Sequence, residues 1–282
     1  MPAPIYFDSH MHTPLCKHAY GEPEEYAKHG REMGLKGIIF TCHSPMPRGF
    51  WPGVRMGMEE FGEYVRIVTR AAKAFTGQME VRLGMESDYF PGFEDWIAEL
   101  HKMAPFHYCL GSVHWQGSDY QQRFKTGDAM EFRRTYFKLL ADSAETGLFD
   151  CLAHPDLIKN YKAEQWNFED VREDVATALD RIARTGVAME LNTSGLMKSY
   201  EEMNPGLDML TMMHERGIPV VVGSDSHRPS RVGEHFITAL QTLQRAGYDK
   251  VSVFENRRRG DLAITDVLTS LTTGLKVDEA EL

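Results

Sequence analysis

Short apolar runs alternate with longer amphipathic stretches along almost the whole chain. The runs are rich in apolar and β-branched residues, as buried strands are, and several of the amphipathic stretches end at glycine, as helices often do. Seven such strand–helix pairs predict a parallel sheet covered by helices. The predicted strands are Ile5–Phe7, Gly37–Thr41, Val81–Met85, Tyr108–Ser112, Cys151–Ala153, Val187–Leu191 and Pro219–Val222. The predicted helices are Glu22–Met33, Met58–Phe75, Asp95–Met103, Ala129–Thr146, Phe168–Arg184, Asn204–Glu215 and Val232–Ala246.

The length of the chain allows this pattern to close into one barrel. The sequence has 282 residues, a length that α/β barrels reach as a single domain, and no linker or low-complexity segment divides it. We therefore predict one α/β domain over residues 1–282, built like a TIM barrel. A further strand, Val251–Phe254, is predicted as an edge or a cap, and the basic run Arg257–Arg259 as a solvated turn.

Composition narrows the cellular setting and the partners. The 31 basic and 41 acidic residues give a net charge of -10, so the chain has no general electrostatic reason to bind nucleic acid or an anionic membrane. The four cysteines show no paired spacing, which favours a reduced, cytoplasmic protein. The first residues, Met1 to His10, lack the pattern of a signal peptide, and no apolar run is long enough to span a bilayer.

Side chains that can bind metals follow six of the seven predicted strands. The carboxyl ends of barrel strands converge on one mouth, so we expect these side chains to meet there. Histidines or acids two residues apart on a strand point to the same side, as in His10–His12 and Asp225–His227. Each histidine alone is more often structural, but their shared position at strand ends makes that explanation weak. The residues at the strand ends are Asp8, His10, His12, His43, Glu86, Asp88, His114, His154, Asp156, Asp225 and His227.

Two neighbouring features leave alternatives open. His18 lies just past the first strand, and Cys16 beside it is a weaker candidate ligand; Cys42 is expected to be buried packing. Asp88 and Asp156 are two residues beyond Glu86 and His154 and should face the mouth. They would either hold a cationic part of a substrate or orient the ligand histidines.

The order of these motifs resembles that of the polymerase and histidinol phosphatase (PHP) superfamily, and within it the histidinol-phosphate phosphatases. The shared motifs are His10-x-His12, His18, Thr41-Cys42-His43, Gly84-x-Glu86-x-Asp88-Tyr89, Ser112-Val113-His114, Ala153-His154-Pro155-Asp156 and Gly223-Ser224-Asp225-Ser226-His227. The closer match rests on Ser44-Pro45-Met46-Pro47, Asp88-Tyr89-x-Pro91-Gly92, Leu157-Ile158-Lys159 and Glu190-Leu191-Asn192-Thr193-Ser194-Gly195. The resemblance implies a distorted barrel of seven βα units with its metal site at the carboxyl ends of the strands.

The resemblance also implies a cluster of three divalent ions, for which imidazole and carboxylate ligands suit Zn, Mn or Fe. One ion would be held by His10, His12, Glu86 and Asp225. A second would share Glu86 and add His114 and His154. The third would be held by His18, His43 and His227.

Such a cluster predicts hydrolysis of a small phosphate monoester. Three divalent ions carry about six positive charges, of which two carboxylates and a hydroxide remove about three, and the excess suits a phosphate dianion. The ions would present hydroxide to phosphorus at neutral pH. The candidate catalytic residues are Asp225, His227 and Asp8. The candidate phosphate-binding cations are Lys159, Lys198, Arg228 and Arg231. The resemblance implies that an arginine is common near the position of Lys198 in this family, and a lysine there would offer a point charge instead of a two-pronged contact.

Histidinol phosphate is the predicted substrate, and the sequence leaves two alternatives. The first is a phosphoesterase of the same superfamily that acts on nucleotides or oligonucleotides. The second is a metal-binding module without catalytic activity, against which the complete set of ligand positions argues. The sequence predicts no oligomeric state.

Overall fold

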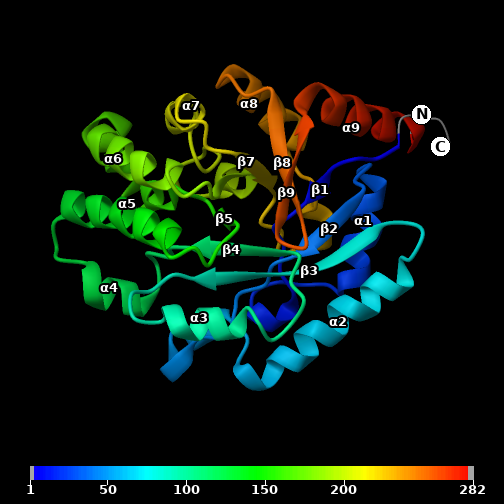
Figure 1. Cartoon of the computed structure of the whole chain (residues 1–282), viewed down its shortest axis with the longest axis horizontal. Coiled ribbons are helices and arrows are strands. Elements are labelled where there is room, and N and C mark those ends of the chain that lie inside the picture. The colour runs from blue at the N-terminus through cyan, green and yellow to red at the C-terminus, as the bar shows by residue number, and fades with distance from the viewer. Residues whose placement is uncertain (1–2, 279–282) are drawn as a thin grey trace.

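Seven parallel strands lie side by side in the order in which they occur along the chain, with helices around them (Figure 1). The computed structural model describes residues 3–278, and for residue 48 and residues 273–278 it describes the backbone alone. The ends of the predicted domain, residues 1–2 and 279–282, lie outside the described residues. The strands are β1 (Phe7–Asp8), β2 (Gly37–Phe40), β3 (Glu80–Asp88), β4 (Tyr108–Ser112), β5 (Cys151–Leu152), β6 (Ala188–Asn192) and β7 (Val220–Gly223).

The first and last strands of the barrel, β1 and β7, are joined only beyond their carboxyl ends. Between β1 and β7 the structure has a single parallel bridge, Met11 to Ser226, which lies just beyond the carboxyl ends of both strands. There His12 N–H donates to the Ser226 carbonyl at 2.9 Å, and Ser226 N–H donates to the His10 carbonyl at 3.0 Å. The predicted TIM-like, distorted barrel of seven strands is confirmed, and its seam brings the first and last metal-binding motifs together.

A two-stranded hairpin covers the other end of the barrel. Strands β8 (Lys250–Glu255) and β9 (Arg258–Ala263) pair antiparallel with each other and not with the seven-stranded sheet. Phe254 packs into the apolar cluster inside the barrel, with its ring 5.0 Å from that of Tyr108. The predicted strand Val251–Phe254 therefore exists and serves as a cap. The amino end of the barrel is closed by packing, so the carboxyl end is the open mouth.

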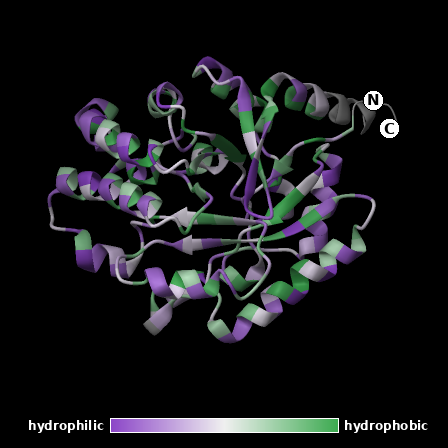
Figure 2. Cartoon of the chain, in the orientation of Figure 1, coloured by the Kyte–Doolittle hydropathy of each residue, from purple (hydrophilic) through white to green (hydrophobic). Residues whose placement is uncertain are grey.

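The helices mix hydrophobic and hydrophilic residues (Figure 2), and many of the hydrophobic ones are buried in the core. All seven predicted helices are present, with ends that differ from the prediction by up to four residues. Two further helices, α4 (Ser118–Phe124) and α9 (Ile264–Asp278), were not predicted. The predicted helix at Asn204 begins only at Leu207, because the backbone of Asn204 pairs instead with Asn192. The helices are α1 (Pro23–Glu32), α2 (Phe61–Ala74), α3 (Glu94–Leu100), α4 (Ser118–Phe124), α5 (Ala129–Glu145), α6 (Arg172–Ala183), α7 (Leu207–Glu215), α8 (Phe236–Arg245) and α9 (Ile264–Asp278).

The described helices include none that is both long and apolar enough to cross a membrane. The turn of the β8–β9 hairpin is made by Asn256 and Arg257, so the predicted turn at 257–259 is correct for Arg257 alone. Arg258 and Arg259 are exposed, as predicted, but they begin strand β9. Arg257 differs from the prediction of a purely solvated side chain. It has a positive φ of 61°, and its guanidinium donates to the Asp150 carboxylate at 3.0 Å and the Leu148 carbonyl at 2.7 Å.

Candidate metal centre

Glu86 is the hub of the site at the barrel mouth. It lies near the carboxyl end of β3, is fully buried, and pairs by a backbone bridge with His43 beyond the end of β2. Its carboxylate oxygens lie 2.8–3.6 Å from ring nitrogens of five histidines. The five are His10, His12, His43, His114 and His154. Histidines from four other strand ends therefore meet around this one carboxylate from β3.

Asp225 is a second acidic centre on the other side of the same histidines. Its Oδ1 lies 3.2 Å from His12 Nε2 and 3.6 Å from His10 Nε2. The backbone of Asp225 has a positive φ of 51°, and the ligand candidate His154 has one of 30°. For residues other than glycine such a conformation is strained and persists only where the surroundings enforce it, as they do at functional sites.

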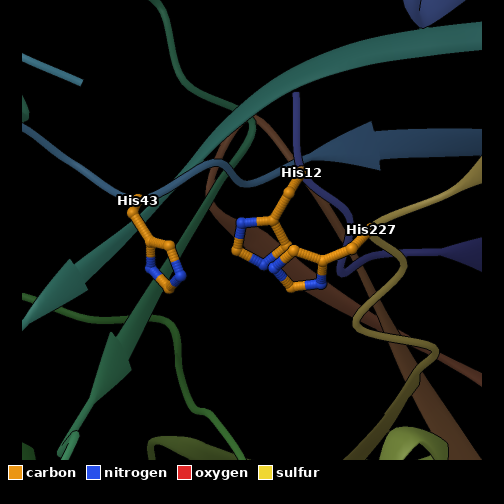
Figure 3. A group of neighbouring side chains, drawn as sticks. All are labelled: His12, His43 and His227. Carbon is orange, nitrogen blue, oxygen red and sulfur yellow. The ribbon is translucent and has the colours of Figure 1, made fainter. Parts of the chain in front are cut away.

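Four histidine rings form the outer part of the cluster. The rings of His12 and His227 lie 4.0 Å apart between centroids and nearly parallel, and His43 lies 4.4 Å from His12 (Figure 3). His18 comes from the loop after β1 and lies 4.5 Å from His227. With these, all nine predicted ligands surround one place at the mouth.

The donor atoms fit divalent metal ions. Several buried ring nitrogens and a carboxylate oxygen find no hydrogen-bond partner within the described residues, namely Nε2 of His10, His12 and His227, Nδ1 of His43 and Oε2 of Glu86. Buried polar atoms without partners are costly, so a cation between them is the natural explanation. Three overlapping sets have donors within 4.8 Å of one another: His10–His12–Glu86, His43–Glu86–His114 and His12–His43–His227. The site can therefore hold divalent metal ions.

The pKa values of His10 and His12 also indicate that the site favours positive charge. Burial acts to lower the pKa of His10, but the charges of Glu190, Asp225 and Glu86 outweigh it and raise that pKa well above its ordinary value. Burial is likewise outweighed at His12, where Asp225 and the other neighbours raise the pKa to about 9. The neighbouring carboxylates therefore favour protonated imidazoles at His10 and His12. Metal cations bound there would replace these protons.

Two acids outside the candidate ligand set accept hydrogen bonds from the rings of candidate ligand histidines. Glu190 on β6 is buried and accepts from His10 Nδ1 at 2.7 Å and from the His154 backbone N–H at 2.9 Å. Asp88 accepts from His114 Nδ1 at 2.7 Å. Such partners set the ring orientation and the basicity of metal-binding histidines. Sequence reasoning gave Glu190 no role, although an acid inside a strand buried on both faces is itself a signal.

Comparison with known proteins agrees with this arrangement. The family profile of the PHP domain matches residues 8–194. The chain is 36% identical over 257 residues to a probable histidinol-phosphatase of Deinococcus radiodurans, covering 89% of this chain and 97% of that protein. The chain belongs to the PHP domain family and, within it, to the histidinol-phosphatases. The resemblance inferred from the sequence motifs is thereby confirmed.

Two further relatives extend the comparison of this PHP domain. The histidinol-phosphatase of Bacillus subtilis is 28% identical over 262 residues, covering 83% of this chain and 98% of that protein. Among solved structures, histidinol phosphate phosphatase from Lactococcus lactis, complexed with Zn, L-histidinol and phosphate, superposes with a TM-score of 0.77 at 20% identity. That match covers 90% of this chain and 98% of the other, and it supports the fold of the PHP domain.

The PHP site differs from the prediction for Asp8. This carboxylate was expected to be catalytic, but it is fully buried beneath the ligands and accepts hydrogen bonds from the backbone N–H groups of His10, Ser224 and Gly233. It also accepts from the Ser224 hydroxyl. Asp8 joins the loops after β1 and β7 and does not line the cavity.

Asp88, Asp156 and Lys159 were predicted to bind substrate, and the structure gives all three internal partners. Asp88 is fully buried and paired with the guanidinium of Arg55 as well as His114. The Asp156 carboxylate accepts from Asn204 Nδ2, the Gly206 N–H and Lys159 Nζ. Lys159 also donates to Glu202 and to the Met203 carbonyl. Of the two roles left open for Asp88, the contact with His114 supports orientation of a ligand.

Four cations were predicted to bind phosphate. Among the described residues that line the cavity, Lys198 is the only one of these four. Its Nζ lies beside the Ser194 hydroxyl and 3.5 Å from Asp225 Oδ2. The guanidinium of Arg228 lies over the ring of Tyr20 at 5.6 Å, and that of Arg231 pairs with Glu234 at 2.7 Å. These two arginines therefore have other partners.

The two cysteines near the site are both buried and free. The Cys42 sulfur accepts from the Thr13 hydroxyl at 3.3 Å and lies within 4.8 Å of donor atoms of His12 and Cys16. Cys16 stays a candidate ligand because its sulfur also lies within 4.8 Å of His18 and His227 donors.

Proposed function

We propose that this protein is a metal-dependent phosphomonoesterase that hydrolyses L-histidinol phosphate to L-histidinol and phosphate in histidine biosynthesis. The observation that carries the proposal is the meeting of nine imidazole and carboxylate side chains, six of which line one open cavity of about 160 Å³ together with Lys198. The histidinol-phosphatase names of the relatives and the Zn, histidinol and phosphate in the Lactococcus lactis structure support the choice of substrate.

We propose three ions, of Zn, Mn or Fe, held as the family resemblance implies. The first would take His10, His12, Glu86 and Asp225, the second Glu86, His114 and His154, and the third His18, His43 and His227. The overlap of the three donor sets through Glu86 and His12 supports a cluster rather than isolated ions. When bound, the ions would lower the pKa of bound water and neutralise phosphate oxygens.

The protein's own residues have distinct parts in this reaction. Asp225 and His227 line the cavity and are the proposed catalytic residues, whereas Asp8 is not. Burial opposes ionisation of Asp225, but His10 and Lys198 outweigh it and hold its pKa well below the ordinary value. Asp225 is therefore charged and able to accept a hydrogen bond or to bind a cation. Lys198 is placed to bind the substrate phosphate.

The free state of all four cysteines supports a cytoplasmic setting, where thiols stay reduced. The experiment that tests the function is elemental analysis of the purified protein together with phosphate release from a panel that includes histidinol phosphate and a nucleoside bisphosphate. Preferred turnover of histidinol phosphate is expected. A metal-loaded protein that prefers the bisphosphate, or is inert toward every ester, would overturn the proposal.

The role of Lys198 has its own test. Lys198→Met should raise the KM for histidinol phosphate by roughly tenfold or more, because one charge-assisted contact to phosphate is lost. Lys198→Arg should retain most of the activity, and Lys250→Met, an exposed lysine in the cap hairpin, is the matched control. An unchanged KM in Lys198→Met would remove Lys198 from the phosphate site.

A further inference from the structure

Part of the cavity wall is made by residues that are neither ligands nor charged. They come from loops that follow three strands: Trp51 and Val54 after β2, Gln116 after β4, and Leu157 after β5. Lys198, the proposed phosphate-binding cation, comes from the loop after β6. The wall therefore combines a polar, histidine-rich region with a separate region that has an aromatic and two aliphatic side chains.

Trp51 is held in this wall by an unusual backbone. Its φ of 37° and ψ of 61° lie in the left-handed region, which a bulky residue rarely adopts. Both of its backbone groups are fixed: the N–H donates to Asp119 Oδ2 at 3.2 Å, and the carbonyl accepts from Arg55 Nε at 3.3 Å. Strain of this kind persists where the surroundings enforce a particular side-chain position.

The indole of Trp51 is also placed relative to the metal ligands. Its ring lies 6.0 Å from that of His114 at an interplanar angle of 59°, and a Cβ on Gly117 would come within 3.1 Å of it. Arg55, which holds the Trp51 carbonyl, is buried and also pairs with Asp88, the partner of His114. One guanidinium thus links the tryptophan loop to the orientation of a ligand histidine.

We propose that Trp51 determines specificity by offering a flat apolar surface to the planar ring of the leaving group. This inference rests on the proposed function and adds to it the part of the site that selects the alcohol. With the phosphate at the metal cluster and Lys198, the remainder of the substrate meets Trp51, Val54 and Leu157. The exposed Gln116 supplies the polar group of this wall. Asp119 and Arg55 are positioning residues for the indole.

The test compares two substrates that share an aminoalkyl phosphate and differ in the ring: L-histidinol phosphate and L-alaninol phosphate. Trp51→Leu should lower kcat/KM for histidinol phosphate roughly fivefold to tenfold, the range of an aromatic contact, mainly through KM. The value for alaninol phosphate should change less than twofold. Trp51→Phe should retain most of the preference, and Asp119→Ala should weaken it in the same direction.

Trp166→Leu is the matched control, since Trp166 is half-buried and packs against Arg133 outside the cavity. Metal content and the thermal midpoint of each variant separate a lost contact from a damaged fold. An equal loss for both substrates, or no loss for either, would overturn the role of Trp51 while the function stands. If the wild-type protein releases no phosphate from histidinol phosphate, the proposed function fails, and this inference fails with it.

Discussion

Glu190→Gln is the substitution that most directly tests how the metal centre is held. The carboxylate is 1% exposed and accepts three hydrogen bonds, from His10 Nδ1 at 2.7 Å, the His154 N–H at 2.9 Å and Asn192 Nδ2 at 3.0 Å. Glutamine has nearly the same shape, but its amide group would turn a donor toward at least one of these donors. The side chain has little room to turn away, because a Cβ on Gly223 would already lie 2.2 Å from Glu190 Oε1.

The expected size of the effect follows from the role of such partners. Loss of a hydrogen-bond partner behind a ligand histidine costs about 10-fold to 100-fold in metal affinity or activity, which corresponds to about 1.4 to 2.7 kcal/mol. Glu190 is also the largest of the charges that raise the pKa of His10, so its removal makes that imidazole a weaker base. Both effects act in the same direction, toward weaker metal binding.

The assay is a competition titration of the metal-stripped protein with a chelating dye, followed by phosphate release from the reconstituted enzyme. Glu80→Gln is the control, because Glu80 is 43% exposed at the start of β3, at the end of that strand remote from the metal centre. Metal affinity and turnover that match the wild type in Glu190→Gln would refute the argument. A lower thermal midpoint of the metal-free variant would show that the effect is on the fold, and Glu190→Asp, which keeps the charge but shortens the side chain, then separates the contribution of the charge from that of the geometry.

Three further substitutions follow from the geometry. Asp88→Asn should lower the metal content, because Asp88 holds His114 and Arg55. It should lower kcat equally for histidinol phosphate and for a phosphate monoester of an uncharged alcohol. A rise in KM for histidinol phosphate alone would contradict this. Asp8→Asn should lower the unfolding free energy in urea by about 1 to 3 kcal/mol, with kcat per metal-loaded molecule preserved. Burial, with Arg257 adding to it, lowers the pKa of His101 to about 4, so wild-type stability falls between about pH 6.5 and 4 as the unfolded chain alone takes up the proton. As the pH falls from 7 to 4.5, the unfolding free energy of His101→Gln should therefore rise by about 2 to 3 kcal/mol relative to that of the wild type. If the difference between the two unfolding free energies does not change with pH, the pKa assignment of His101 is wrong.

The meeting of the candidate ligands at one place could be predicted because it depends on few assumptions. Apolar runs fixed the strand ends to within a few residues, and parallel barrel topology places those ends at one mouth. His10 and His12, or Asp225 and His227, then share a side by strand alternation alone. Their meeting across the seam needed only that the first and last strands become neighbours, which the bridge from Met11 to Ser226 provides.

The roles of the acids near the ligands could not be predicted in the same way. Alternation places Asp88 on the same side as Glu86, but whether it meets substrate depends on what covers it. The cover is Arg55, which lies in an irregular loop whose path has no periodic signal in the sequence. Asp156 is likewise enclosed by Lys159 and by Asn204, a residue far along the chain.

The two ends of the barrel divide stability from chemistry. At the amino end, the cap hairpin inserts Phe254 among apolar side chains, and the interior there is closed. At the carboxyl end the backbone is strained at His154 and Asp225, and buried nitrogens and oxygens are left without partners among the described residues. Without bound cations, burying several acids together with imidazole nitrogens that lack hydrogen-bond partners raises the free energy of the folded state. Cations that bind there would remove this cost, so metal binding should raise the stability of the whole domain as well as supply its chemistry.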